Sequence, residues 1–137
     1  MNQTDFKVRC WIPELKYMLY SDELSQNGNY CMYFGDDGLV VEHRTDLWWI
    51  VETIPMIALP IKDIHNKQIY ESDILVYTNP KYPDHKSYII KWNADDCCFE
   101  CINETNFMLP SVWSEMEIIG NAYENPELIN DTFISIH

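Results

Sequence analysis

The sequence contains few basic residues, few glycines and no long apolar run. Nine Lys and Arg residues stand against 22 Asp and Glu residues, which gives a formal net charge of −13, and only four of the 137 residues are glycine. This shortage of cations argues against binding to nucleic-acid backbones or anionic membranes, because phosphate binding uses Lys and Arg to displace counterions. The first residues lack the basic and apolar segments of a signal peptide. We therefore expect a soluble, cytoplasmic protein.

Several motifs that define enzymes and binding modules are also missing. The sequence contains no glycine-rich phosphate loop, no nucleophile elbow, no basic aromatic motif for nucleic acid, no internal repeat and no low-complexity tract. Cysteine is present, but its five copies are an odd number. In a cytosolic chain such thiols are expected to be reduced. The pattern favours an intracellular protein without a disulfide framework.

The residues that are present predict a folded core. Nearly half of the chain is hydrophobic (47%), and aromatic residues make up 14% of it. This composition provides enough apolar surface for one domain of this length. We expect a single domain over residues 1–137. The alternative division is an N-terminal β subdomain over residues 1–57 and a barrel-like core over residues 58–130.

Short β-prone segments alternate with turn signals along the whole sequence. The expected strands are residues 6–12, 17–20, 30–34, 39–42, 48–57, 74–77, 87–92, 97–102 and 117–123. Gly35-Asp36-Asp37-Gly38 predicts a hairpin turn, and Pro55 predicts an edge position, a bulge or a strand end. Residues 110–115 predict one helical turn, and residues 124–129 a small helix. The fold class is all-β or β-dominated α+β: a small SH3-like, barrel-type sheet with an N-terminal hairpin extension and a short C-terminal helix.

Three stretches of the sequence resemble the YopX family of phage and prophage proteins. Residues 59–77 contain Lys-Asp-Ile-His-Asn-Lys-Gln-Ile-Tyr-Glu-Ser-Asp-Ile, residues 116–128 contain Glu-Ile-Ile-Gly-Asn-Ala-Tyr-Glu-Asn-Pro-Glu-Leu, and residues 6–18 are similar to the opening hairpin of the family. The motif positions, expected to be structural, are Asp63, Ile69, Tyr70, Glu71, Asp73, Gly120, Asn121, Tyr123, Glu124, Asn125 and Pro126. The resemblance implies a β-rich, phage-encoded accessory protein of the host cytoplasm, with no assigned enzymatic chemistry.

Two positions depart from the family pattern in ways that matter for the backbone. Asn66 stands in a turn where the family commonly has glycine, and asparagine also tolerates the left-handed conformation. Ser72 replaces the glycine of a Glu-Gly-Asp step. Serine with a positive φ is strained, so either the local backbone differs or glycine is not strictly required there.

The adjacent pair Trp48-Trp49 is the strongest candidate for a binding site. Neighbouring residues of a strand face opposite sides, so at most one of these tryptophans can enter a given core. The other then lies in a groove, against a second packed surface or at an interface, where tryptophan is enriched. The candidate partner-binding residues are Trp48, Trp49, Glu42, Asp46, Glu52, Asp36, Asp37, Asp95 and Asp96. The alternative is that both faces of this strand are covered, either by other parts of the same chain or by a second copy of it.

Charge and family together predict a protein-binding accessory protein. The expected partner is a host protein with a basic surface, and a homo-oligomer is a further alternative. In the specific form of this hypothesis, the acidic protein inhibits a host nucleic-acid-handling or defence protein, such as a CRISPR effector. Its carboxylates would then occupy a channel built for phosphates. No catalytic residue, metal or cofactor is predicted.

Two other function classes remain open from the residues alone. A metal-assisted, carboxylate-based hydrolase would use Asp63, Asp73, Asp95, Asp96 or His65. A nucleic-acid-binding module would need a basic patch, and the loose cluster available for it is Lys81, His85, Lys86 and Lys91.

The segment Cys97-Cys98-Phe99-Glu100-Cys101 contains a Cys-X-X-Cys spacing. A structural zinc site needs four ligands, and no second cysteine pair or spaced histidine pair accompanies this one. On a strand, Cys97, Phe99 and Cys101 share one face whereas Cys98 points to the other. We therefore expect small buried hydrophobic residues of a hairpin at these positions.

Overall fold

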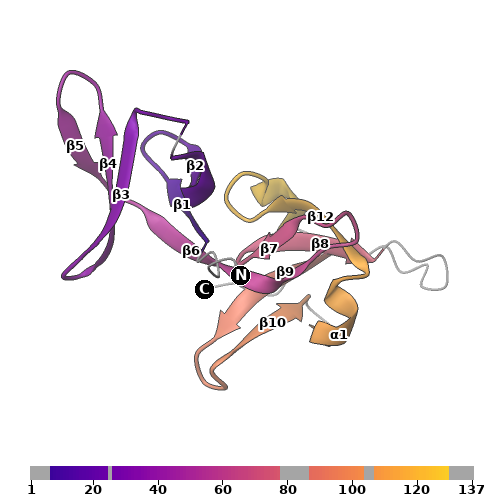
Figure 1. The fold of residues 1–137 in the computed structure, drawn as a ribbon. Coiled ribbons are helices and arrows are strands. Elements are labelled where there is room, and N and C mark those ends of the chain that lie inside the picture. Colours follow the sequence, from indigo (N-terminus) through magenta and orange to yellow (C-terminus); the bar gives the residue numbers. More distant parts are fainter. Residues whose placement is uncertain (1–6, 25, 78–86, 104–106, 130–137) are drawn as a thin grey trace, which may run out of the picture. The chain divides into compact units, whose positions relative to one another are not determined.

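The structure of the protein, a computed structural model, describes residues 7–24, 26–77, 87–103 and 107–129. The chain forms two compact units, Met1–Ile57 and Ala58–His137, called here the N-terminal unit and the C-terminal unit. Both are built mainly of strands (Figure 1). The predicted β-dominated fold is confirmed, including a half-barrel sheet and a short helix. The assignment of residues 1–137 as one YopX-like domain stays a prediction.

The N-terminal unit consists of consecutive antiparallel hairpins. Its elements are β1 (Val8–Ile12), β2 (Tyr17–Tyr20), the 3₁₀ helix η1 (Ser21–Glu23), β3 (Tyr30–Gly35), β4 (Gly38–Arg44), β5 (Trp48–Val51) and the first part of β6 (Ile54–Lys62). β1 pairs with β2, and β3, β4 and β5 form a three-stranded sheet in that order. The predicted opening hairpin is confirmed over the described residues; its expected start at residue 6 lies outside them.

The β3–β4 turn depends on glycine. Gly35 pairs with Gly38 across the two acids Asp36 and Asp37, and Gly38 has a φ of 118°, which side chains rarely adopt. The predicted hairpin turn is therefore confirmed. Its strands are longer than expected, since β4 continues to Arg44.

The core of the N-terminal unit lies against one face of the three-stranded sheet. Cys10, Ile12, Leu19 and Val41 are fully buried there. The side chains packed around them include Tyr17, Leu24, Tyr30, Met32, Leu39 and Val51. Alternation along β3, β4 and β5 places Met32, Val41 and Val51, which are cross-strand partners, on this inner face.

Strand β6 continues through Pro55, where the sequence predicted an edge, a bulge or an end. Pro55 pairs with Cys10 of β1, and the ladder to β1 extends to Ile57. From Ala58 onward β6 pairs with β7 (Gln68–Tyr70) instead. Pro55 pairs only with β1 in the described part of the chain, so its missing N–H is tolerated. The strand itself lies between β1 and β7 and continues to Lys62, so it neither lies at the edge of the sheet nor ends at Pro55 as predicted.

The C-terminal unit contains a five-stranded antiparallel sheet. Its order is β11 (Phe107–Met108), β10 (Cys98–Ile102), β9 (Ser87–Asn93), β8 (Asp73–Tyr77) and β12 (Met116–Asn121). The helix α1 (Pro110–Trp113) precedes β12, and the 3₁₀ helix η2 (Pro126–Ile129) follows it. Proline opens α1 as predicted. The predicted C-terminal helix forms only as a 3₁₀ turn.

The C-terminal unit buries an aromatic and aliphatic core. The buried side chains are Leu59, Ile69, Leu75, Tyr77, Tyr88, Ile90, Cys101, Trp113 and Met116. The indole Nε1 of Trp113 donates to the backbone oxygen of Met108 at 2.8 Å, so this large side chain is buried with its polar atom satisfied.

The turn from β6 to β7 is organised by Asp63. Its Oδ1 accepts the backbone N–H groups of His65 at 2.9 Å and Lys67 at 2.8 Å, and its Oδ2 accepts that of Ile118 in β12 at 3.0 Å. Asn66 adopts a φ of 66°, which confirms that asparagine substitutes for glycine in the left-handed position. One buried carboxylate therefore ties the turn to the last strand.

The turn from β7 to β8 keeps the conformation expected for glycine. Ser72 has a φ of 74° and is buried, so the backbone of this step does not change to relieve the serine. The backbone N–H of Ser72 donates to the backbone oxygen of Ile90 at 2.8 Å. The backbone oxygen of Ser72 accepts the N–H of Ala122 at 3.0 Å. The Oδ2 of Asp73 accepts the Tyr70 N–H at 2.7 Å. The strand β9 and the turn after β12 thus hold Ser72 in place.

The segment after β12 is a turn built on asparagine side chains. The Oδ1 of Asn121 accepts the N–H groups of Tyr123 at 3.0 Å and Glu124 at 2.8 Å, and its Nδ2 donates to Glu124 Oε1 at 2.8 Å. Asn125 Oδ1 accepts the N–H of Asn121 at 3.1 Å. These contacts give the Gly-Asn-Ala-Tyr-Glu-Asn-Pro segment a role in ending the sheet.

Candidate functional site

The candidate site is the face of the β3–β4–β5 sheet that points away from the core of the N-terminal unit. Cross-strand partners share a face, so the pairs Cys31–Glu42–Ile50 and Arg44–Trp48 lie opposite the inner face that carries Val41. This surface, called the outer face below, consists of Cys31, Tyr33, Val40, Glu42, Arg44, Trp48 and Ile50.

The outer face exposes unusually large apolar side chains. The exposed fraction is 73% for Ile50, 43% for Trp48 and 42% for Tyr33. Antiparallel sheets commonly solvate one face, but that face is then polar. Large apolar and aromatic side chains exposed on one surface mark an interaction site in many proteins. The outer face therefore has the composition of a contact surface.

Polar contacts hold the aromatic side chains of the outer face in place. The Tyr33 hydroxyl donates a hydrogen bond to Glu42 Oε2, and this bond, together with desolvation and the nearby negative charge, raises the pKa of Tyr33. The Arg44 guanidinium lies over the Trp48 ring, 5.9 Å from its centroid. Because Trp48 and Tyr33 are already oriented, less side-chain freedom is lost when a partner binds.

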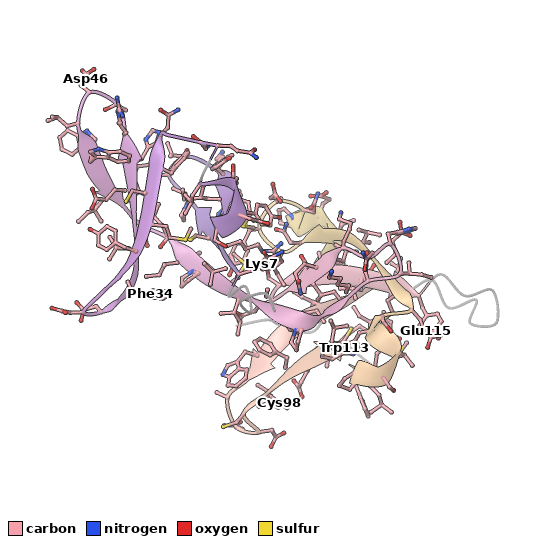
Figure 2. The ribbon with its side chains drawn as sticks, viewed as in Figure 1. Lys7, Phe34, Asp46, Cys98, Trp113 and Glu115 are labelled. Carbon is pink, nitrogen blue, oxygen red and sulfur yellow. The ribbon has the colours of Figure 1, made fainter. Side chains whose placement is uncertain are left out.

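Acidic residues flank the outer face at the ends of its strands. Asp36 and Asp37 form the β3–β4 turn, Asp46 lies in the β4–β5 turn, and Glu52 follows β5. Figure 2 shows Asp46 at the tip of the β4–β5 hairpin and Phe34 near the opposite end of the sheet. All four acids are exposed. The site thus combines exposed aromatic and apolar side chains, placed around Glu42 and Arg44, with negatively charged ends.

The predicted binding residues do not all lie on this surface. Glu42 and Trp48 belong to the outer face. Trp49 lies on the inner face, in the cross-strand row of His43 and Tyr30, and has an exposed fraction of 57%. Neither tryptophan enters the core. Asp95 and Asp96 lie in the β9–β10 turn of the C-terminal unit, so they are not part of the outer face.

Sequence reasoning missed five members of the outer face: Cys31, Tyr33, Val40, Arg44 and Ile50. A signal for Ile50 was present, because it follows Trp48 at the two-residue period of a strand. Tyr33 and Arg44 lie on other strands, and their place beside Glu42 and Trp48 depends on the register of both hairpins. That register becomes visible only in the structure.

The carboxylates considered for a hydrolase have different structural surroundings. Asp63 and Asp73 are buried, and their oxygens accept backbone N–H groups of the turns described above. Asp95 and Asp96 are exposed in a hairpin turn, where their N–H groups donate to Asn93 Oδ1. Within the described residues, no three His, Cys, Asp or Glu side chains are grouped so that they could hold a metal ion.

His65 and a shallow pocket lie near Asp63. His65 Nε2 is 3.4 Å from Glu117 Oε2, and both side chains are substantially exposed. The pocket, with a volume of about 600 Å³, is lined by Pro60, Ile61, Lys62, Asp63, Asn66, Gln68 and Ser114. The Asp63 oxygens are engaged by three backbone donors, which fits a structural role for this carboxylate.

The cysteines do not behave as predicted at two positions. Cys97 has a φ of 53° and belongs to the turn before β10, and both Cys97 and Cys98 are exposed rather than buried. The prediction of buried side chains there is wrong, because the strand begins one residue later than expected. Cys101 is buried, and Cys98 and Cys101 point apart as predicted. All five cysteines are free thiols.

The expected basic cluster can be placed only in part. Lys91 lies on β9 and is half-buried. Lys81, His85 and Lys86 lie outside the described residues. Among the helices that the structure describes, none is long and apolar enough to cross a membrane.

Fold and surface together define a class: a small β-dominated protein with a half-barrel sheet and a sheet face suited to contacts. The model of the YopX protein family matches residues 7–130, and the chain therefore belongs to the YopX family. The family suggested by the sequence motifs is thus confirmed.

Two solved structures are similar to the chain. Protein EF1440 from Enterococcus faecalis is 24% identical, with a TM-score of 0.56, and the match covers 93% of this chain and 100% of that one. Protein yopX from Bacillus subtilis is 20% identical, with a TM-score of 0.63, and the match covers 90% and 98%. At these identities the comparison shows a shared fold. No curated protein matches the chain.

Proposed function

We propose that the protein acts by binding another protein through the outer face of its β3–β4–β5 sheet. The observation that carries this proposal is the exposure of Tyr33, Trp48 and Ile50 on one sheet face. Tryptophan and tyrosine are the residues that most often dominate protein–protein binding energy, and here they are already oriented by Glu42 and Arg44. The inner face supplies the core contacts of this sheet, so the outer face is available to a partner.

The charge pattern supports a partner with a basic surface. The chain carries a formal net charge of −13, and the acids Asp36, Asp37, Asp46 and Glu52 lie at the ends of the outer face. Complementary charge at the rim of an interface accelerates encounter and selects against partners of the same sign. In this arrangement apolar contacts supply affinity at the centre, and the acids select a positively charged partner.

The specific form of this proposal is inhibition of a host nucleic-acid-handling or defence protein, such as a CRISPR effector. Membership of the YopX family, whose resemblance in sequence implied a phage-encoded accessory protein, and strong negative charge support it. Proteins that bind nucleic acid present Lys and Arg in grooves built for phosphates. An acidic protein that occupies such a groove competes with the nucleic acid and blocks the activity of the partner.

Affinity capture with matched variants tests the proposal. The wild-type protein, the double variant Trp48→Ala/Ile50→Ala and the control Trp92→Ala are immobilised, and bacterial proteins retained at low and high salt are identified by mass spectrometry. Trp92 is a suitable control because it has the same exposed fraction as Trp48, 43%, and lies on β9 of the C-terminal unit.

We expect a basic protein to be retained by the wild type and by the control, to be lost with the double variant, and to be released at high salt. The purified partner is then titrated by calorimetry against each form. Equal retention by all three forms would contradict binding through the outer face. Retention of nucleic acid, detected by a gel-shift assay at low salt, would favour the nucleic-acid-binding alternative.

A further inference from the structure

Strand β5 forms one edge of the three-stranded sheet. The order β3–β4–β5 places it beside β4 on one side, and no strand among the described residues pairs with its other side. The N–H of Arg44 donates to the Asn29 oxygen at 2.8 Å, so Arg44 uses its backbone groups on the β3 side. Along a strand, the backbone N–H and C=O groups of successive residues point to alternate sides. The backbone groups of His43 and Val41 therefore point toward β5.

This alternation fixes which backbone groups of β5 point outward. His43 and Val41 pair with Trp49 and Val51, whose N–H and C=O groups therefore face β4. The N–H and C=O groups of Trp48 and Ile50 consequently face away from the sheet. The same two residues carry their side chains on the outer face. Backbone groups and apolar side chains are thus both available along one edge.

An edge of this kind is a template for an added strand. β5 is short and entirely apolar, and Trp48, Trp49 and Ile50 are all exposed. Natural proteins protect apolar edges with charges, prolines or bulges because such edges otherwise pair with another chain. The charges that flank β5 along the chain are Asp46 before it and Glu52 after it, each just outside the strand, while Glu42 and Arg44 lie beside it on β4. They leave the edge open and select what can pair with it.

We propose that β5 binds an extended segment of the partner protein by strand addition, and that this segment is apolar at its centre and carries Lys or Arg at both ends. The inference rests on the proposed function and specifies its binding mode. The central residues of the segment pair with the backbone of Trp48 and Ile50, and its basic ends lie opposite Asp46 and Glu52. Main-chain hydrogen bonds supply affinity, while the charged ends supply specificity.

The charges at β5 argue against a second copy of the same chain as the added strand. Antiparallel self-pairing centred on Trp49 places Asp46 of one copy opposite Glu52 of the other at both ends. Like charges directly opposite destabilise such a pair, and a net charge of −13 on each copy adds long-range repulsion. A basic-ended segment has the opposite sign at both positions.

Amide hydrogen exchange with a defined peptide tests the inference. The probe is a terminally blocked peptide, Lys-Thr-Val-Thr-Val-Thr-Lys, and the full chain is isotope-labelled for NMR. In the free protein we expect the amides of Trp48 and Ile50 to exchange faster than those of Trp49 and Val51, which face β4. Saturating peptide should slow exchange at Trp48 and Ile50 and leave the other two unchanged. No protection at saturating or highest soluble peptide concentration overturns the inference.

A backbone variant and its side-chain control separate strand addition from simple face contact. Ile50→Pro removes an outward N–H without removing a ladder bond to β4, whereas Ile50→Ala removes only the side chain. We expect the proline variant to bind the peptide about fivefold more weakly than the alanine variant, the effect of losing one net hydrogen bond. If the two variants bind equally and exchange at Trp48 is unchanged, strand addition is wrong while binding through the outer face still stands.

A charge exchange tests the expected ends of the segment. The variant Asp46→Lys/Glu52→Lys should lose affinity for the lysine-ended peptide and gain it for a matched peptide that ends in glutamate. The expected change is about fivefold in each direction, as two exposed ion pairs are made or lost. The variant Asp95→Lys/Asp96→Lys changes the net charge equally and serves as the control. An equal response of both variants contradicts selection at β5.

Discussion

The carboxylate of Asp63 accepts the backbone N–H of Ile118, 55 residues further along the chain, at 3.0 Å. The other oxygen of the same carboxylate closes the β6–β7 turn through His65 and Lys67. One side chain thus closes the β6–β7 turn and also holds that turn against β12, the last strand among the described residues. This relationship explains why an acid in an exposed-looking polar stretch is buried.

Removal of the Asp63 carboxylate should strongly destabilise the protein. Asp63→Ala leaves three backbone N–H groups without their acceptor, and we expect a loss of about 3 kcal/mol in the free energy of unfolding. Asp63→Asn keeps one acceptor oxygen and should cost about half as much. Urea denaturation followed by fluorescence measures both. If the two variants have equal stability, the bonds that His65 and Lys67 donate to the retained oxygen do not contribute significantly.

Gly120 should be intolerant of a side chain because Asn125 lies against it. A Cβ at this position would lie 2.5 Å from Asn125 Oδ1, the atom that accepts the Asn121 N–H. We expect Gly120→Ala to cost about 1–2 kcal/mol, because Asn125 must move away from its donor. In the Asn125→Ala background the same substitution should cost clearly less. A double-mutant cycle from thermal unfolding measures this coupling, and additive costs would contradict the contact.

Ser72 should tolerate glycine far better than a β-branched residue. Its φ of 74° is held by the backbone bonds to Ile90 and Ala122. Ser72→Gly relieves strain but increases the entropy of the unfolded chain, so we expect a change of less than about 1 kcal/mol. Ser72→Val should lose about 2 kcal/mol or more, since branched residues are severe outliers there. Similar melting temperatures for both variants would show that the turn relaxes.

The five thiols should divide into two classes by reactivity. Cys31, Cys97 and Cys98 are exposed, whereas Cys10 and Cys101 are buried. We expect a chromogenic disulfide reagent to modify the three exposed thiols rapidly and the two buried thiols only after denaturation. Mass spectrometry of peptides after alkylation identifies the modified residues. Rapid modification of Cys101 in the native protein would contradict its burial.

Stability should fall at alkaline pH because two thiols are buried in neutral form. Burial raises the pKa of Cys101 from 9.0 to about 12 and that of Cys10 to about 11. The unfolded chain releases these protons first, so the contribution to stability is complete below pH 9 and is lost as the pH rises toward the folded pKa. For Cys101 the loss is about 2 kcal/mol at about pH 10.5.

Denaturant titrations between pH 9 and the folded pKa of Cys101 measure how the free energy of unfolding changes with pH. Cys101→Ala removes one of the two groups and should flatten the dependence, although it lowers stability at every pH through the cavity it leaves. The control Cys98→Ala removes an exposed thiol and should leave the slope unchanged. If Cys101→Ala leaves the pH dependence of the unfolding free energy unchanged, ionisation of the Cys101 thiol is not the cause of the alkaline loss of stability.

Local patterns predicted much of the fold. The hairpin turn at Gly35-Asp36-Asp37-Gly38 was predictable because only glycine readily adopts the φ that Gly38 shows. The left-handed Asn66 followed from its side-chain chemistry in the same way. What sequence reasoning missed depends on contacts between distant residues. The switch of β6 from β1 to β7 after Ile57 follows from pairing on two separate strands, and no local signal marks it.

The candidate site was predictable only through Trp48 and the acids around it. Period-two alternation showed that the two tryptophans face opposite sides, but it could not show that both stay exposed. Tyr33 and Arg44 joined the site only when the hairpin registers placed them beside Glu42 and Trp48. Asp95 and Asp96 were grouped with the site by charge alone, and the structure places them in a turn of the C-terminal unit.

The inner face of the β3–β4–β5 sheet packs against the core of the N-terminal unit, whereas the outer face is exposed. Val41 and its neighbours on the inner face sustain the core, so replacing Trp48, Ile50 or Tyr33 on the other side costs little folding energy. Recognition residues that are decoupled from folding can diversify quickly. Under the proposed function, the outer face can therefore change along with the surface of its partner while the scaffold stays the same.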